Sequence, residues 1–228
     1  MTLIIGIETA TEICSVAIGL NGKCIAKINH PQPNAHASHL HAMVKEILQE
    51  NKYTLAQLDA IAVSIGPGSY TGLRVGVSAA KGFAYALKIP VIAINTLHSL
   101  AAHFLHQFPN NESLLVPFID ARRMEVYSAV FDSNLQFLEE TKAKIINENA
   151  LSEWLNQNKI AVFGNGAEKC MNVIKHPNAT YYPEIHCDSE GLLGLAQIAF
   201  DQNKFADLAY FEPYYLKDFV GTTPKKLK

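Results

Sequence analysis

The sequence predicts an α/β protein with a mixed sheet, and three observations support this class. Residues 61–94 have the order strand, glycine-rich turn, helix and strand, which is a βαβ unit with a parallel, right-handed connection. Three strand-like runs precede this unit, so the first half has the order βββαβαβ. A second series of strands and helices follows a break at residues 109–111.

The composition is that of a globular chain with one large domain or two small ones. The chain has 228 residues, of which 49% are hydrophobic and 18% are charged. A net charge of −2 gives no basic field for holding nucleic acid, so contact with RNA is expected only through a partner. The four cysteines lack metal-ligand spacing and are expected to be reduced. With neither a signal-peptide pattern nor an apolar run of about 20 residues, the chain is predicted to be cytoplasmic and free of membrane.

The first half is expected to open with three strands, at residues 3–7, 13–20 and 23–29. Asn21-Gly22 is a strong hairpin signal between the last two strands. A helix is predicted over residues 38–51, where apolar residues recur at helical spacing. A short helix at 55–58 then leads into the central strand.

The central unit starts with a strand at 61–65, and the Gly-Pro-Gly turn at 66–68 ends that strand. Ser69 and Thr71 can cap a helix over 71–87, which is followed by a strand at 91–94. Each interior glycine of a helix costs roughly 0.5–1 kcal/mol relative to alanine. Either close packing on its own sheet or a surface from another chain would explain the three glycines of this helix, Gly72, Gly76 and Gly82.

The second half is predicted to repeat the order of the first in a reduced form. After a helix at 98–108, the expected strands are 114–119, 126–132, 137–144 and 160–163, and the expected helices are 150–158 and 192–202. We therefore predict two lobes, 1–108 and 109–228, with the C-terminal tail packing back on the first.

Two turns, at residues 8–11 and 164–166, are candidates for weak nucleotide binding. A turn between strands with an acid and small residues can hold magnesium and phosphate, and a GxG turn after a strand can lie near an adenine. For the first turn an ordinary chain reversal is the favoured interpretation, and a lone GxG is a weak signal for the second. The candidate residues are Glu8, Thr9, Thr11, Gly164 and Gly166.

Catalytic and metal-ligating residues are not expected in this chain. His36 with His39, or His39 with His103, could form a pair of ligands, but no acid stands at a supporting spacing. The sequence also lacks HExxH and GxSxG motifs. Residues 120–125 carry an acid at each end and two arginines between, which favours a charge-paired turn over a general acid–base pair.

Three motifs together resemble the TsaB (YeaZ) family. They are GPGSYTGLRVG at 66–76, IETAT at 7–11 with CSVA at 14–17, and DARRMEVY at 120–127. This resemblance implies two lobes of the ASKHA fold (actin, sugar kinase, Hsp70; RNase H-like), the second reduced. It also implies a non-catalytic partner of TsaD, the enzyme that forms N6-threonylcarbamoyladenosine next to the tRNA anticodon, with the ATPase TsaE as a third component.

The resemblance further implies that catalysis belongs to the partners. TsaD-type enzymes carry Asn-His-Leu-Glu-Gly-His after the strand that follows the glycine helix, and its two histidines bind the catalytic metal. Here Thr96 and Leu100 stand at those two positions, and neither side chain can hold a divalent ion. ATP and a divalent metal are thus expected in the partner subunits, and no cofactor is expected on this chain alone. Glu8-Thr9-Ala10 in place of the common Asp-Thr-Ser, and Tyr215-Leu216-Lys217 in place of Tyr-Leu-Arg, make nucleotide binding less expected.

Helices 38–51 and 71–87 are the expected interface with TsaD, as half of a small helix bundle. A homodimer through the same surface is the alternative without TsaD, and Gly76→Leu is expected to weaken the heterodimer while leaving the monomer folded. An ATP-dependent small-molecule kinase or carbamoyl transferase, and a glycopeptidase, are the rival functions. The predicted interface residues are His39, Met43, Ile47, Gly72, Leu73, Arg74, Gly76, Val77, Ala80, Lys81 and Ala84.

Overall fold

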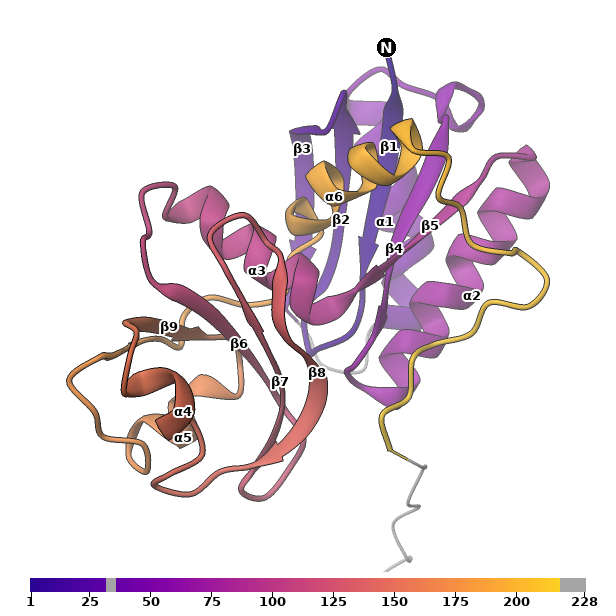
Figure 1. The fold of residues 1–228 in the computed structure, drawn as a ribbon. Coiled ribbons are helices and arrows are strands. Elements are labelled where there is room, and N and C mark those ends of the chain that lie inside the picture. The colour runs from indigo at the N-terminus through magenta and orange to yellow at the C-terminus, as the bar shows by residue number, and fades with distance from the viewer. Residues whose placement is uncertain (32–35, 218–228) are drawn as a thin grey trace, which may run out of the picture.

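The computed structural model describes residues 1–31 and 36–217, which form two five-stranded sheets with helices around them (Figure 1). The first sheet has the order β3-β2-β1-β4-β5. β1 pairs antiparallel with β2 and parallel with β4, so the sheet is mixed, as predicted. Its strands are β1 (Leu3–Glu8), β2 (Cys14–Leu20), β3 (Lys23–His30), β4 (Ala60–Gly66) and β5 (Val91–Asn95).

The second sheet has the order β10-β9-β6-β7-β8 and repeats the pairing pattern of the first. β6 pairs antiparallel with β7 and parallel with β9, just as β1 pairs with β2 and β4. The predicted internal duplication and the two-lobed α/β class are therefore confirmed. The strands are β6 (Leu114–Asp120), β7 (Glu125–Phe131), β8 (Phe137–Ile145), β9 (Ile160–Phe163) and β10 (Ala179–Tyr182).

The second lobe is reduced in its helices and not in its strands. The predicted helix over 150–158 is wrong in length, because turn hydrogen bonds from Ala150 N to Asn147 O and from Ser152 N to Asn149 O precede a single turn, α4 (Ser152–Leu155). The sequence pattern does not predict α5 (Ala167–Met171) or β10, because both are too short to show a period.

Four long helices cover the faces of the two sheets. α1 (His36–Glu50) and α2 (Tyr70–Leu87) cover one face of the first sheet, and α6 (Glu190–Asp201) covers the other (Figure 1). α3 (Thr96–Gln107) packs on the second sheet and against α6. A short 3-10 helix, η1 (Leu55–Gln57), precedes β4. The junction of the two lobes is therefore the contact between α3 and α6.

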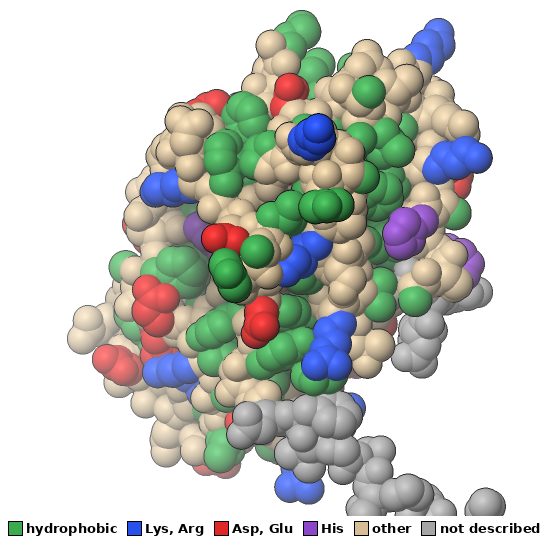
Figure 2. Space-filling model, turned by 90° about the vertical axis from the view of Figure 1, so that its right-hand side faces the viewer, with side chains coloured by type: hydrophobic (Ala, Val, Ile, Leu, Met, Phe, Trp, Pro, Cys, Tyr) green, Lys and Arg blue, Asp and Glu red, His purple; other side chains and the backbone are tan. Residues whose placement is uncertain are grey.

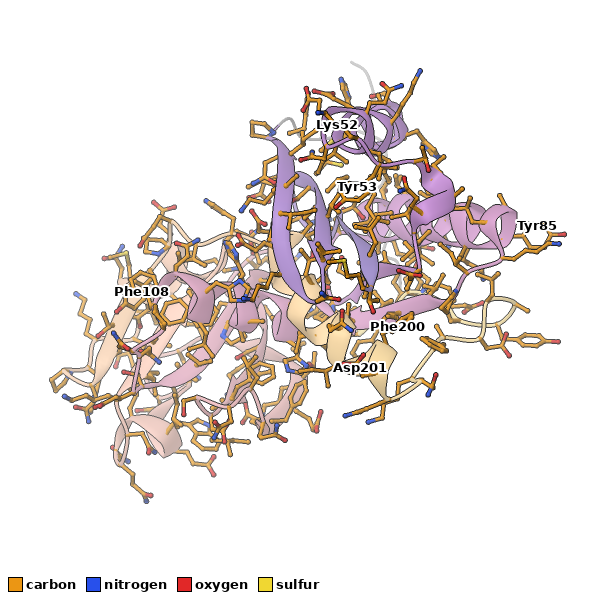
Figure 3. All side chains as sticks on the ribbon, turned by 90° about the horizontal axis from the view of Figure 1, so that it is seen from above. Lys52, Tyr53, Tyr85, Phe108, Phe200 and Asp201 are labelled. Carbon is orange, nitrogen blue, oxygen red and sulfur yellow. The ribbon has the colours of Figure 1, made fainter. Side chains whose placement is uncertain are left out.

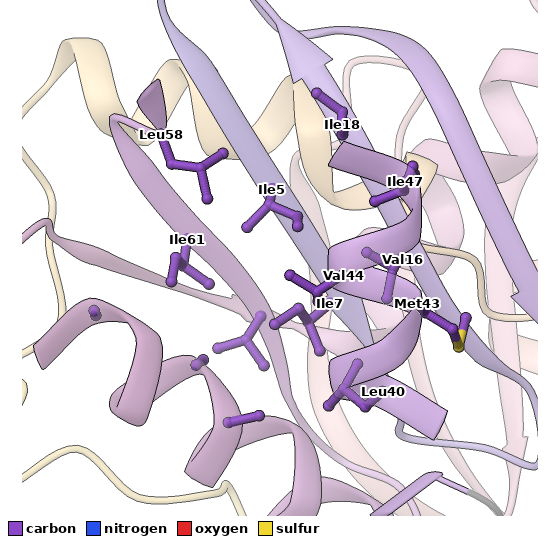
Figure 4. Close-up of a cluster of buried hydrophobic side chains, with 14 of the residues drawn as sticks. Ile5, Ile7, Val16, Ile18, Leu40, Met43, Val44, Ile47, Leu58 and Ile61 are labelled. Atoms are coloured by element: carbon purple, nitrogen blue, oxygen red, sulfur yellow. The ribbon is translucent and has the colours of Figure 1, made fainter. Parts of the chain in front are cut away.

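The largest apolar cluster lies between the first sheet and helices α1 and α2. Leu40, Val44 and Ile47 of α1 point at the strand residues Ile7 and Val16 (Figure 4). These side chains are almost completely buried, as the helical spacing of the apolar residues predicts. The apolar stripe of α1 consequently faces its own sheet.

Side-chain caps determine where two of these helices begin. Ser69 Oγ accepts a hydrogen bond from Gly72 N at 3.3 Å, and α2 starts at Tyr70, one residue earlier than predicted. Asn95 Oδ1 accepts from Leu97 N at 2.9 Å, so α3 starts two residues before the predicted His98. These caps hold the turn after β4 and the turn after β5.

The C-terminal segment, residues 206–217, returns to the first lobe beside α2 (Figure 1). Ala206 N donates to Val91 O at 2.8 Å, and Tyr214 N donates to Ile65 O at 2.7 Å. The rest of the predicted tail, residues 218–228, lies outside the described residues, and the 1–108 and 109–228 division stays a prediction. In the described part of the chain, none of the helices combines the length and hydropathy that a bilayer span needs.

Candidate functional site

The inner side of α2 packs on the turn that follows β1. A Cβ at Gly72 would lie 2.1 Å from Thr9 O, and a Cβ at Gly76 would lie 2.2 Å from Thr9 Oγ1. Thr9 Oγ1 also donates a hydrogen bond to Gly72 O at 2.8 Å. Two of the three helix glycines are therefore explained by close packing within this chain, because no larger residue fits between helix and turn.

Most of the predicted interface residues face the interior of the chain. Their side chains are covered by the chain's own sheet and turns, and their assignment to an interface stays a prediction. The expectation that Gly76→Leu leaves the monomer folded is wrong, because no larger residue fits at Gly76 between helix and turn. The eight buried residues are Met43, Ile47, Gly72, Leu73, Gly76, Val77, Ala80 and Ala84.

The other three predicted interface residues contact other parts of the chain. Arg74 lies over the Tyr70 ring, 4.2 Å from its centroid, and its Nε donates to the Tyr215 hydroxyl at 3.1 Å. Lys81 Nζ donates to the backbone oxygen of Phe211 at 3.1 Å. Arg74 and Lys81 thus hold the C-terminal segment beside α2. His39 is half-buried, and its ring stacks on His30 with centroids 4.2 Å apart.

The solvent-facing side of the helix pair has different residues from those predicted. Tyr85 is 79% exposed and projects away from the body of the molecule (Figure 3). Tyr85 and Leu208 line a shallow pocket at this end of α2. The centroid of the His41 ring lies 5.4 Å from that of the Phe83 ring. On this side of the molecule, hydrophobic side chains lie between scattered Lys and Arg side chains (Figure 2). We define the outer face as His41, Ala42, Lys45, Ser78, Gly82, Phe83, Tyr85 and Ala86.

The candidate phosphate turn at residues 8–11 is covered by the N-terminus of α2. Glu8 is fully buried, and its Oε1 accepts from Ala10 N and Ser64 Oγ, both at 2.7 Å. This burial raises the pKa of Glu8 to about 7, although the hydrogen bonds lower it. A Cβ at Gly68 would lie 2.5 Å from Ala10 O. The turn therefore packs against protein, and Thr11 is buried with it.

The glycines at the second candidate turn also serve close packing within the chain. Gly164 has a φ of +101°, and a Cβ there would lie 2.4 Å from Phe118 O. A Cβ at Gly166 would lie 3.1 Å from the carbonyl carbon of Phe118. Between them, Asn165 Nδ2 donates to Glu12 Oε2 at 3.0 Å, which joins the two candidate turns across the lobes. The fold brings these turns together, and nucleotide binding there stays a prediction.

Positions 96 and 100 are both enclosed by protein. Thr96 Oγ1 accepts a hydrogen bond from Gly66 N at 3.0 Å. Leu100 is buried next to Gly164, where an added Cβ would lie 2.9 Å from Leu100 Cδ2. A hydroxyl that already binds the backbone and an aliphatic side chain provide no ligands for a metal ion.

The acids of the turn at 120–125 are charge-paired, although not with the arginines between them. Asp120 binds Lys169, and Glu125 binds Lys217. The charge-paired interpretation of this turn is therefore confirmed with different partners. Arg122 and Arg123 lie in the exposed part of the turn, with positive φ angles of 68° and 51°.

Comparison with known proteins places these motifs in a family. Residues 30–218 match the family model described as TsaD, tRNA N6-adenosine threonylcarbamoyltransferase. The chain is 33% identical to the Haemophilus influenzae tRNA threonylcarbamoyladenosine biosynthesis protein TsaB, over 98% of this chain and 96% of that protein. It is 29% identical to the Escherichia coli protein of the same name, over 96% of both.

A solved structure supports the same conclusion. YeaZ from Pseudomonas aeruginosa aligns with a TM-score of 0.84 and 27% identity, over 95% of this chain and 100% of that chain. By contrast, a Phocaeicola vulgatus protein named tRNA N6-adenosine threonylcarbamoyltransferase is 34% identical over only 52% of this chain and 40% of its own length. Full-length agreement is thus with TsaB, and partial agreement is with the transferase. The chain belongs to the TsaB (YeaZ) family, within the group of proteins that the TsaD family model describes.

Proposed function

We propose that this chain, as a component of tRNA threonylcarbamoyladenosine biosynthesis, is a non-catalytic partner that holds TsaD in an active arrangement. The observation that carries the proposal is the full-length match to TsaB in a chain whose buried Thr96 and Leu100 replace the expected metal-binding histidines. With Glu8 enclosed under α2, the phosphate turn adds no exposed acid to a reaction centre. The transfer chemistry is accordingly assigned to TsaD.

The division of labour follows from this assignment. ATP and the catalytic divalent metal are held by the partner subunits TsaD and TsaE. tRNA is met only through the complex, because a chain with a net charge of −2 lacks the basic surface that binds a polyanion. This chain contributes a folded surface.

The outer face of α1 and α2 is the surface that we assign to TsaD. It combines exposed Tyr85, the half-exposed ring of Phe83 and the small residues Ser78 and Gly82, so a partner helix can approach closely between the aromatic side chains. A chain that matches the TsaD family model shares its fold, and related folds present equivalent helix pairs to each other. Without TsaD, a second copy of this chain can use the same face.

Gly82→Arg tests the proposal. Among the described residues nothing lies within 4 Å of a Cβ at Gly82, so the monomer is expected to remain folded while a long charged side chain enters the outer face. We expect the affinity for TsaD, measured by calorimetry, to fall about tenfold or more, as for the loss of a central interface contact. Gly194→Arg is the matched control, because Gly194 lies on α6 and its Cβ position is equally open.

Three outcomes contradict parts of the proposal. Wild-type affinity for Gly82→Arg would exclude the outer face, and an equal loss for Gly194→Arg would point to a different surface. If light scattering after size exclusion detects no one-to-one complex of the wild-type chain with TsaD, the partnership itself is wrong. Tight ATP binding by the chain alone would then favour the ATP-dependent kinase or carbamoyl transferase.

A further inference from the structure

We propose that His103, Asp188 and Glu190 form a binding site for a first-row divalent metal ion of the Zn²⁺ type, where α3, α6 and β3 meet. One ligand atom from each of the three residues lies within 4.8 Å of those from the other two. His103 Nδ1 is 3.8 Å from Glu190 Oε2. This site is independent of the proposed partnership with TsaD, and it revises the expectation that the chain has no metal ligands.

His103 has the properties of a metal ligand. Its side chain is only 6% exposed, and its Nδ1 has no hydrogen-bond partner in the described part of the chain. A buried nitrogen without a partner is costly unless something binds it. The direction of this nitrogen, toward two carboxylates, indicates a cation.

The far side of the imidazole is supported as in known metal sites. His103 Nε2 lies 2.9 Å from the amide nitrogen of Gln107, one turn further along α3. A 180° rotation of that amide places its oxygen there instead, so that Nε2 donates the ring proton and the Nδ1 lone pair faces Glu190. A hydrogen bond of this kind from the second ring nitrogen orients most ligating histidines.

The two carboxylates are held in place by the fold. Asp188 Oδ1 accepts from Glu190 N at 2.9 Å, and Asp188 Oδ2 accepts from Asn29 Nδ2 at 2.8 Å. Gly191 allows the close approach of the helices, since a Cβ there would lie 2.2 Å from Ser99 O. Glu190 is thereby brought beside His103.

Charge at this site also favours a divalent cation. Lys27 Nζ lies 3.0 Å from Asp188 Oδ2 and 2.9 Å from Glu190 Oε2, so one ammonium group is shared by two carboxylates and one negative charge is uncompensated. The Lys27 side chain is 30% exposed, which lets it turn to solvent when a metal ion replaces it. Lys27 is therefore a built-in competitor of the metal.

The donor set selects the type of metal. Imidazole with two carboxylates suits Zn²⁺ and similar ions better than Mg²⁺ or Ca²⁺, which prefer oxygen ligands only. His106 lies on the solvent side of the same carboxylate, with its Nδ1 3.7 Å from Glu190 Oε1. An ion held by these residues would link α3 to α6 at the junction of the two lobes and would stabilise the folded state by mass action.

Metal titration of the full-length, metal-stripped chain without an affinity tag tests the proposal. We expect one Co²⁺ per chain, seen by its visible absorption, displacement of Co²⁺ by Zn²⁺, and a higher Tm with Zn²⁺. His103→Asn and Glu190→Gln are each expected to weaken binding by about tenfold or more. Lys27→Met is expected to tighten binding about tenfold, because it removes the competing positive charge. A site made only of ion pairs would lose stability in Lys27→Met and gain no metal affinity.

Two control variants separate this site from other metal-binding groups. Cys24→Ser removes a nearby thiol whose pKa is raised by burial and by the charge of Glu190, and His41→Ala removes an exposed histidine on α1. Both controls should bind Co²⁺ like the wild type. The proposal is overturned if neither the wild type nor Lys27→Met binds one ion, if His103→Asn and Glu190→Gln both keep full affinity, or if Cys24→Ser abolishes binding. If His103→Asn fails to fold, Glu190→Gln still tests the site, because Glu190 is partly exposed and its substitution is expected to leave the fold intact.

Discussion

Gly72 and Gly82 are both glycines of α2, but Gly72 lies on the inner side of the helix, packed against protein, and Gly82 lies on its open outer side. A Cβ at Gly72 would lie 2.1 Å from Thr9 O, whereas within the described residues a Cβ at Gly82 has no neighbour inside 4 Å. The first glycine is required for the fold, and the second weakens the helix without a packing gain among the residues that the structure describes. Only the side with Gly82 is therefore free for a partner.

Gly72→Ala is expected to cause the largest change in stability among the variants of this helix and the segments packed on it. The added methyl group meets a backbone oxygen, which cannot move without displacing the turn after β1. We expect the free energy of unfolding, measured in urea, to fall by about 3 kcal/mol. A loss well below 1 kcal/mol would mean that the turn after β1 moves to make room, and that the inner side of α2 accepts a larger side chain as readily as the outer side.

Glu8→Gln tests the same turn through pH. Because burial raises the pKa of Glu8 from 4.5 to about 7, the folded state binds this proton more tightly than the unfolded state does. The resulting stabilisation is complete below pH 4.5 and is lost as the pH rises through 7. At about 1.4 kcal/mol per pKa unit, wild type should lose up to about 3 kcal/mol over this range that Glu8→Gln does not lose.

The measurement for Glu8 is urea unfolding at several pH values, with Glu46→Gln on the exposed side of α1 as the control. The control should follow the wild-type pH dependence. Parallel curves for wild type and Glu8→Gln would show that Glu8 does not carry this proton.

Gly82→Ala should change stability in the opposite direction from Gly72→Ala. Alanine removes the entropic penalty of a helical glycine and meets no described neighbour, so the free energy of unfolding should rise by roughly 0.5–1 kcal/mol. Chemical denaturation of both variants side by side measures the contrast. Destabilisation by Gly82→Ala would show that the outer face is already covered within the chain.

Tyr215→Phe is expected to have the smallest effect. It removes the hydrogen bond that Arg74 Nε donates to the Tyr215 hydroxyl and keeps the ring beside Tyr70. Because this contact is exposed, we expect a loss of only about 0.5 kcal/mol by thermal unfolding. A loss above about 1.5 kcal/mol would mean that the C-terminal segment is a principal support of α2.

The sequence predicted the long elements of this fold better than the short ones. Strands β1 to β9 and the helices α1, α2, α3 and α6 were expected within a few residues, because period, turn residues and caps are local signals. The five-residue helix α5 and the four-residue strand β10 are maintained by tertiary pairing, such as that of Tyr181 with Val162, which a local pattern does not contain.

The amino-acid sequence by itself determined the α/β order, the family motif at 66–76 and the absence of ligand side chains at Thr96 and Leu100. It did not determine the orientation of α2, because a helix that is apolar nearly all round has no polar side to mark its solvent face. Tertiary packing decided that Gly72 faces Thr9 and Gly82 faces solvent. It also brought His103 to Glu190, since residues far apart in sequence meet only when their helices pack.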